Sequence, residues 1–245
     1  MSFVSTPKVC IAIPTINESD NLKILVPKLR KLLPNALIII IDDASTDNTQ
    51  VFLEQAMEKD RSLKAIFRDK RFGIGSAHLL AIEYAFNQGF EILITMDGDL
   101  THSPEDALRL LESIKGHDLA IGSRYQENGR TKNWSPYRYF LTHAGHLMTN
   151  LFFRSDLDMS SALRAYNVRN IPLSSLKENC PMNYAFFFTS SLVYMKKKLQ
   201  ITQIPVTLEN RASGSSKMSP RLMILGVNQL LLYGFRIKKI LLIQD

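Results

Sequence analysis

Asp97 and Asp99 are the two residues whose type and spacing point most directly to chemistry. They follow the apolar run Ile92–Met96, and Gly98 permits a tight turn between them. Two carboxylates at the end of a strand are suited to bind a hard divalent cation, directly or through water. Such a cation neutralises a diphosphate and stabilises it as a leaving group. The alternative is an ordinary surface turn, which an Asp-Gly dipeptide also marks.

Two further polar clusters follow apolar runs in the same way. The stretch Pro14–Glu18 follows Val9–Ile13, and Asp42-Asp43 follows Leu37–Ile41. Their carboxylates can accept hydrogen bonds from a base N–H or from ribose hydroxyls, or they can cap the helix that comes next. Ligands bind at the carboxyl ends of the strands in open parallel sheets. The three clusters therefore predict one site, and they favour metal binding over a surface turn.

A basic loop with two glycines runs from Arg68 to Gly75 and leads into a predicted helix. The start of a helix after such a loop is suited to nucleotide phosphates. The loop does not match the dinucleotide-binding pattern, because His78 stands where a third glycine would be. The first predicted strand-to-helix turn also lacks that pattern, so a dehydrogenase is disfavoured.

The elements that must position these clusters alternate along the first half of the chain. Short apolar runs predict five strands: Val9–Ile13, Leu37–Ile41, Leu63–Phe67, Ile92–Met96 and Leu119–Ile121. Helical spacing between them predicts four helices: Asn21–Leu33, Thr49–Lys59, Ser76–Asn87 and Pro104–Ile114. Ser19, Asp47 and Ser103 are the predicted caps of the first, second and fourth helices. This alternation predicts an α/β fold, a mostly parallel central sheet with helices on both faces.

The alternation loosens beyond residue 124. Helices are predicted at Ser135–Phe153 and Met182–Lys198, and a strand at Ile201–Leu208. A helical tail is expected from near Pro220. We therefore expect one domain over residues 1–220, with a nucleotide and metal half (1–123) and an acceptor half (124–220). An amphipathic helical tail would follow at 221–245.

The charges are unevenly divided between the two parts of the chain. Residues 1–120 carry a net charge of −4 and the remaining 125 residues carry +11, within a total of +7. This division predicts a metal site beside an anion-binding surface. Nucleic acid is a disfavoured partner, because the basic residues are scattered and form no recognised motif. The composition, with 45% hydrophobic and 22% charged residues, is that of an ordinary globular protein.

Cysteine use and the absence of targeting patterns favour a cytoplasmic location. Cys10 and Cys180 form neither a disulfide framework nor a metal-binding spacing. No signal peptide is recognisable, and no apolar segment is long enough to span a bilayer. Contact with the cytoplasmic face of a membrane remains open, because Ser135–Phe153 and Leu222–Ile243 are rich in apolar and aromatic residues. The alternative is packing of these segments against the domain or a second subunit, and the oligomeric state is not predicted.

Five motifs in their order and spacing resemble those of family 2 glycosyltransferases with the GT-A fold. They are IPTINE, IIDDASTD, GIGSA, MDGDLTHSP and IGSRY. Within that family the likeness is to polyprenol-phosphate sugar synthases such as the dolichol-phosphate mannose synthases, and it covers residues 8–220. The resemblance implies inverting transfer of a sugar from a nucleotide-diphosphate donor to a polyprenyl phosphate, with GDP-mannose as one candidate donor. It also implies Mg2+ or Mn2+ as cofactor.

The resemblance further implies roles for individual residues. Nucleoside contacts would come from Pro14, Thr15, Glu18 and Asp43. The metal and diphosphate would be bound around Gly98 by Asp97, Asp99 and Thr101. Donor and acceptor phosphates would be contacted by Arg124, Arg138, Arg164, Arg211 and Lys217, and each lone arginine has the alternative of a solvated surface charge. Among all these, the residues implied to act directly in transfer are Asp97, Asp99, Arg124 and Arg211.

The chain departs from the family pattern at two places. Residues 158–164 read DMSSALR, where a D-x-T-(S/G)-G-F-R motif is usual, and Phe187 and Thr189 stand where a Gln and a Glu are common. These differences leave a second hypothesis open, a degenerate transferase that binds a nucleotide sugar or a partner without turnover. A phosphate acceptor is already an anion at neutral pH and needs no general base, so the loss of the Glu is compatible with transfer to a phosphate.

Overall fold

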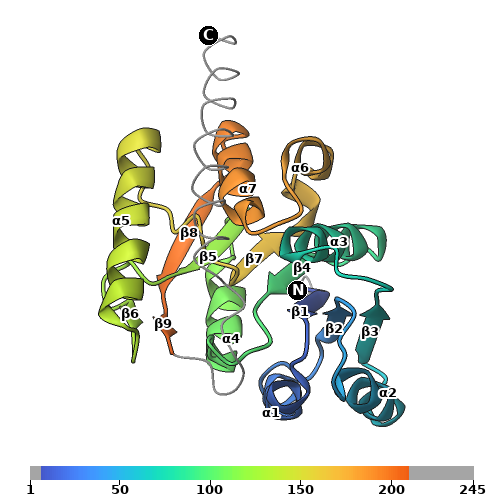
Figure 1. Cartoon of the computed structure of the whole chain (residues 1–245). Coiled ribbons are helices and arrows are strands. Elements are labelled where there is room, and N and C mark those ends of the chain that lie inside the picture. The colour runs from blue at the N-terminus through green and yellow to red at the C-terminus, as the bar shows by residue number, and fades with distance from the viewer. Residues whose placement is uncertain (1–6, 210–245) are drawn as a thin grey trace.

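The computed structural model describes residues 7–209, and their centre is a seven-stranded sheet in the order β3-β2-β1-β4-β7-β5-β8 (Figure 1). The strands of this sheet are β1 Val9–Thr15, β2 Leu37–Asp42, β3 Leu63–Phe67, β4 Ile92–Thr95, β5 Leu119–Ser123, β7 Arg164–Asn167 and β8 Ile201–Pro205. A separate parallel pair joins β6 (Arg130–Thr131) to β9 (Thr207–Leu208).

Helices cover both faces of the sheet. The helices are α1 Ser19–Leu32, α2 Thr49–Lys59, α3 Ile74–Asn87, α4 Pro104–Ser113, α5 Pro136–Phe153, α6 Leu173–Asn179 and α7 Ala185–Lys196, with a 3-10 turn at Val168–Asn170. One core lies between the sheet and α3, α6 and α7, and the other lies between the sheet and α1, α2 and α4. The helix α5 stands apart at the end of the sheet where β8 lies (Figure 1).

The predicted mostly parallel sheet is confirmed. β1 pairs in parallel with both β2 and β4, and β2 pairs with β3. β1 and β4 are buried throughout and carry runs of apolar side chains, as expected for central strands covered on both faces. Sequence analysis missed β7, which pairs antiparallel with β4 and β5. Its sequence, RAYN, is short and half polar, so it lacks the apolar run that marks the other strands.

The predicted caps are partly correct. Ser103 caps α4, and its Oγ accepts a hydrogen bond from the Glu105 N–H at 3.2 Å. Ser19 is instead the first residue of α1. The carboxylate of Asp47 accepts from the N–H of Ser19 at 3.3 Å and from the N–H of Thr49 at 3.0 Å. Asp47 therefore serves the starts of two neighbouring helices, which sequence spacing alone does not reveal.

The second half differs from the prediction in detail. The helix expected from Met182 begins at Ala185, where the Asn183 Oδ1 accepts the Ala185 N–H at 2.9 Å. The strand expected at 201–208 is divided by Val206 into β8 and β9. The predicted tail and the candidate residues Arg211 and Lys217 lie outside the described residues.

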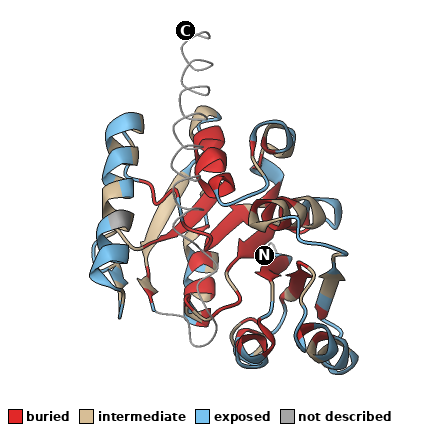
Figure 2. Ribbon diagram, viewed as in Figure 1, coloured by how far each residue is buried: buried red, intermediate tan, exposed pale blue. Residues whose placement is uncertain are grey.

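Burial follows this architecture closely. The central strands are buried, whereas α5 is exposed over much of its surface (Figure 2). Within residues 7–209, no helix combines the length and the apolar character that crossing a bilayer would require.

Candidate active site

The acidic turn lies at the carboxyl end of β4, against the end of β1. A Cβ at Gly98 would lie 3.2 Å from Ile13 Cγ2 and 3.4 Å from Thr15 Oγ1, so the glycine lets the turn pack closely on β1. The Oδ1 of Asp99 accepts from the Thr101 N–H at 3.1 Å and from the Thr101 hydroxyl at 2.6 Å. Asp99 is 5% exposed, whereas the Asp97 side chain is 35% exposed. The turn thus braces the Asp99 carboxylate, whereas the Asp97 carboxylate is partly exposed to solvent.

His102, which sequence analysis did not single out, lies beneath this turn. Its Nδ1 is 3.9 Å from Asp97 Oδ2, too far for a hydrogen bond. Burial lowers the pKa of His102 to about 4, against the opposing pull of Asp99. The imidazole is therefore neutral at pH 7 and forms no ion pair with Asp97.

The donor atoms at the turn fit a divalent cation that is bound together with a diphosphate. Among residues 7–209 there is no group of three or more His, Cys, Asp or Glu side chains that could enclose a metal by itself. Mg2+ is commonly bound by only one or two carboxylates together with substrate phosphates and water. Asp97, Asp99 and the Thr101 hydroxyl carry oxygen atoms that could serve as ligands of this kind. The chemistry of the site therefore agrees with a metal that arrives with the nucleotide.

Asp43 connects the end of β2 to the basic loop. Its two carboxylate oxygens accept from the N–H groups of Phe72 and Gly73, each at 3.0 Å, and Oδ1 lies 3.0 Å from Arg68 Nη1. The Asp43 N–H donates to the Thr15 carbonyl at 2.8 Å, which joins the ends of β1 and β2. The predicted nucleoside residues Thr15 and Asp43 are thus brought together, and Asp43 also positions the loop.

The other two candidate carboxylates of this edge also have protein partners. Asp42 accepts from both the N–H and the hydroxyl of Ser45. Glu18 accepts from the Asn21 side-chain amide and is buried. Both lie beside the site, where they stabilise the loops that follow β1 and β2. Pro14 is a buried residue of β1 and pairs with Ile41 in β2.

Gly73, before α3, and Gly75, in its first turn, allow a close packing contact. A Cβ at Gly75 would lie 2.6 Å from the Pro181 carbonyl oxygen and 2.7 Å from that of Asn183. The Ser76 N–H, at the start of the helix, donates to the Met182 carbonyl at 3.2 Å. This helix start, predicted to bind phosphate, is therefore occupied by backbone oxygens of the 181–183 segment.

Arg124 and Asp158 form a buried ion pair behind the acidic turn. Arg124 Nε lies 2.9 Å from Asp158 Oδ2, and the two side chains are 11% and 0% exposed. Burial alone would raise the pKa of Asp158, but the charge of Arg124 and hydrogen bonds from Ser160 outweigh it and lower the pKa. Burial would likewise lower the pKa of Arg124, but the charges of Asp158 and Asp97 raise it. The guanidinium thus stays charged and within electrostatic reach of the acidic turn.

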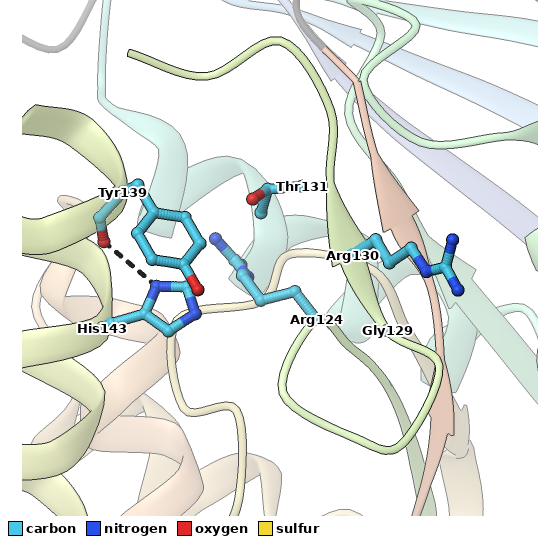
Figure 3. Close-up of a pocket in the computed structure, with 6 residues that line it drawn as sticks. All are labelled: Arg124, Gly129, Arg130, Thr131, Tyr139 and His143. Atoms are coloured by element: carbon cyan, nitrogen blue, oxygen red, sulfur yellow. Dashed lines mark hydrogen bonds between the residues drawn. The ribbon is translucent and has the colours of Figure 1, made fainter. Parts of the chain in front are cut away.

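The guanidinium of Arg124 faces a cavity of about 240 Å³ (Figure 3). The cavity is lined by Arg124, Gly129, Arg130, Thr131, Tyr139 and His143. Arg138 lies beside this region, with its guanidinium 3.9 Å from the centroid of the Trp134 ring. None of the six lining residues is acidic. Two of the predicted phosphate-contacting arginines, Arg124 and Arg138, therefore lie at an anion-compatible surface.

The buried position of Arg164 contradicts its predicted role as a phosphate contact. It is fully buried on β7, and its side-chain nitrogens donate to carbonyl and hydroxyl oxygens at 2.8 to 3.1 Å. The partners are the carbonyls of Met159, Ser161 and Phe187 and the hydroxyls of Ser190 and Ser191. A phosphate cannot reach a guanidinium whose donors are all engaged inside the core. Arg164 instead joins the 159–161 segment to α7.

The two residues that depart from the family pattern on α7 are also internal. Phe187 is 4% exposed and Thr189 is fully buried. Phe187 packs its ring edge against His78, with a centroid distance of 4.7 Å. Neither position lines the cavity at Arg124: Phe187 is part of the apolar core, and Thr189 is a buried polar residue on the same helix.

Comparison with known proteins agrees with this architecture. Residues 10–171 match the model of glycosyl transferase family 2. The chain is 30% identical over 213 residues to an undecaprenyl-phosphate mannosyltransferase of Micrococcus luteus, covering 86% of this chain and 88% of that protein. It is 29% identical to a polyprenol monophosphomannose synthase of Mycolicibacterium smegmatis, covering 87% of this chain and 82% of that protein.

Solved structures show the same fold at lower sequence identity. Glucosyl-3-phosphoglycerate synthase from Mycobacterium tuberculosis, in complex with Mn2+, UDP and phosphoglyceric acid, matches with a TM-score of 0.68 and 14% identity. The match covers 94% of this chain and 79% of that one. The predicted α/β fold and family are thereby confirmed. The chain belongs to glycosyl transferase family 2 and is a glycosyltransferase with the GT-A fold.

Proposed function

We propose that this glycosyltransferase transfers a sugar, with inversion, from a nucleotide-diphosphate sugar to a polyprenyl phosphate. The observation that carries the proposal is the acid-free cavity at Arg124, next to the acidic turn. The relatives at about 30% identity are named as mannosyltransferases of undecaprenyl or polyprenol phosphates. Mannose, carried by GDP, is therefore the first donor sugar to test.

The proposed residues form two groups, one for the metal and the leaving diphosphate and one for the acceptor phosphate. Asp97, Asp99 and Thr101 would hold a divalent cation, Mg2+ or Mn2+, which when bound neutralises the departing diphosphate. Arg124, held by Asp158, places a fixed positive charge between this turn and the cavity. A phosphate oxygen of the acceptor attacks the anomeric carbon from the face opposite the leaving group. The acceptor phosphate is an anion at neutral pH, so most acceptor molecules need no base to remove a proton before they attack.

The nucleoside would lie at the ends of β1 and β2. The Thr15 carbonyl and the Asp43 carboxylate are joined there, and the loop from Arg68 to Gly73 is bound to Asp43. We assign residues 1–123 to donor and metal binding and residues 124–220 to acceptor binding within a single domain. Arg211 and Lys217 remain candidates for phosphate contacts, and residues 221–245 for an amphipathic tail.

Contact with the cytoplasmic face of a membrane is part of the proposal. The exposed apolar side chains of α5 are Tyr137, Tyr139, Phe140, Leu147, Met148, Leu151 and Phe152. The helix contains no acidic residue. An exposed apolar face without acids is suited to the interface of anionic lipids. A surface of this kind beside the cavity would let a lipid-linked acceptor enter without leaving the bilayer.

A transfer assay tests the proposal. The full chain is incubated with Mn2+ or Mg2+, with GDP-, UDP- or dTDP-sugars, and with a polyprenyl phosphate, and the lipid-linked sugar is measured. We expect transfer from one donor class and its loss when EDTA removes the metal. Donor binding without transfer or hydrolysis on any donor would favour a nucleotide-sugar-binding module, the second function suggested by Phe187 and Thr189.

A further inference from the structure

One residue of the Arg124 cavity carries an imidazole and comes from the opposite wall. His143, on α5, lines the cavity that Arg124 faces, and Figure 3 shows the guanidinium directed toward the rings of Tyr139 and His143. The His143 ring stacks on Tyr139 at a centroid distance of 3.9 Å and meets the Tyr125 ring edge-on at 5.3 Å. These contacts fix the plane of the imidazole within the cavity wall.

The hydrogen bond of His143 decides which ring nitrogen is available. Its Nδ1 lies 3.0 Å from the Tyr139 carbonyl oxygen. A carbonyl oxygen only accepts, so Nδ1 carries the hydrogen in the neutral ring. Nε2 is then left with its lone pair. In the neutral state His143 therefore offers a proton acceptor, and in the charged state it offers a second donor.

A polyprenyl phosphate brings a matching proton. The second pKa of a phosphate monoester is about 6, so below that pH the acceptor enters as a monoanion with one P–OH group. The monoanion is the poorer nucleophile, because its proton withdraws charge from the attacking oxygens. Arg124 and Arg130 carry permanent charges and accept no proton.

We propose that Nε2 of His143 accepts the remaining proton of the acceptor phosphate, so that the phosphate attacks as a dianion. The inference rests on the proposed function, in which the acceptor is a phosphate monoester. The O–H bond of the phosphate breaks and an N–H bond forms at Nε2. The phosphate oxygen then forms a bond to the anomeric carbon while the bond between that carbon and the diphosphate oxygen breaks, and the electron pair of that second bond leaves with the nucleotide diphosphate. The proton passes from His143 to solvent after the lipid product departs.

The charged and titratable groups around His143 are compatible with this role. Arg124, Tyr125 and Arg130 come from the loop after β5 and from β6. Arg138, Tyr139 and His146 come from α5. The carboxylates of Asp158 and Asp156 act on the neighbouring His146. Asp158 is paired with Arg124 and is fully buried. A bound phosphate dianion is therefore the counter-charge that would stabilise protonated His143.

Phosphorus NMR on the full chain with a short-chain polyprenyl monophosphate tests the inference directly. The variants are His143→Gln and, as matched control, His146→Gln, whose ring stacks on Tyr125 at 3.6 Å outside the cavity lining. In wild type the bound phosphate should remain a dianion to a pH about one unit lower than in His143→Gln, a tenfold shift in its protonation equilibrium. The control should titrate like wild type.

Transfer kinetics supply the second readout. For His143→Gln, kcat/KM at pH 6 relative to pH 8 should fall roughly tenfold below the wild-type ratio, with little change at pH 8. Identical phosphate titration in wild type and His143→Gln would overturn the inference, and so would equal shifts in both variants, which indicate a general field effect. If wild type binds no polyprenyl phosphate but binds nucleotide sugar, the proposed acceptor fails and the inference fails with it.

Discussion

Arg124 and Arg164 show how two arginines with the same predicted role acquire different ones. Arg124 pairs with a single buried carboxylate and turns its guanidinium to a cavity. Arg164 has carbonyl and hydroxyl partners on the 159–161 segment and on α7. The difference depends on the antiparallel strand β7, which carries Arg164 into the core. Sequence motifs identify the arginines but not the direction in which each one points.

Replacement of Arg164 by lysine should cost at least about 3 kcal/mol in the free energy of unfolding. Lysine supplies one ammonium group in place of a planar fork, so several buried oxygens lose their donors. Urea unfolding measures the loss. Arg130→Lys, at an exposed position, should change stability by less than about 0.5 kcal/mol. A stable Arg164→Lys variant with weaker phosphate binding would contradict the structural role.

Asp97→Asn should abolish metal-dependent donor binding and leave the fold intact. Asp97 is partly exposed and supplies a carboxylate of the proposed metal site, whereas Asp99 is buried and braced by Thr101. Bound ligands raise the apparent stability of the native state. Thermal-shift measurements with Mn2+ and a nucleotide sugar should therefore show an increase in Tm for wild type and none for the variant. Asp20→Asn, an exposed change on α1, should keep the wild-type increase.

At the scale of elements, prediction from sequence was accurate where one periodicity dominates. The first four helices and five strands were located to within two residues at most boundaries, because apolar runs and helical spacing alternate cleanly there. Prediction from sequence was wrong where contacts between distant segments determine the role of a residue. The glycines at 73 and 75 suggested a phosphate loop, yet they are required because the 181–183 backbone lies against them.

Gly75→Ala should therefore destabilise the protein although alanine favours helices. The added Cβ would meet backbone oxygens of Pro181 and Asn183 at 2.6 and 2.7 Å, and relief requires a shift of α3 or of that segment. We expect a loss of about 1–3 kcal/mol in chemical unfolding. Gly145→Ala, on α5 with no atom within 4 Å of the new Cβ, should be neutral or gain up to about 1 kcal/mol. Equal effects of the two changes would show that the close contact is not important.

The exposed face of α5 should govern membrane association. The double variant Phe140→Glu/Leu151→Glu places charges at two exposed apolar positions of this helix. Its binding to anionic vesicles in sedimentation assays at low salt should be at least about tenfold weaker than that of wild type. The control, Val51→Glu/Phe86→Glu, changes two exposed apolar residues on α2 and α3 and should bind as wild type does. Absence of wild-type binding would remove the membrane proposal.

At the scale of the whole molecule, the buried histidines make stability depend on pH. Burial lowers the pKa of His78 to about 3 and that of His102 to about 4. The unfolded chain, in which histidine titrates near 6.5, takes up protons that the folded state excludes. Stability is therefore full above that pH and falls as the pH drops below it.

We expect proton uptake by His78 in the unfolded chain to lower the free energy of unfolding by about 1 kcal/mol between pH 6.5 and 5.5. His78→Leu keeps an apolar group against Phe186 and Phe187 and should make the pH dependence of unfolding less steep by that amount. Urea unfolding at the two pH values measures the difference. An unchanged slope in the variant would mean that folding does not shift the pKa of His78.

The antiparallel pairing of β7 has a consequence for the evolution of this enzyme. β5 ends, and β7 begins, at the same edge of the sheet, so the excursion from residue 124 to 163 leaves and returns beside the carboxylates proposed to bind the metal. That excursion contains the cavity wall and α5. It can be lengthened, trimmed or exchanged without altering the register of any strand of the seven-stranded sheet. Recognition of new acceptors can therefore diversify as a replaceable insert while the donor machinery stays constant.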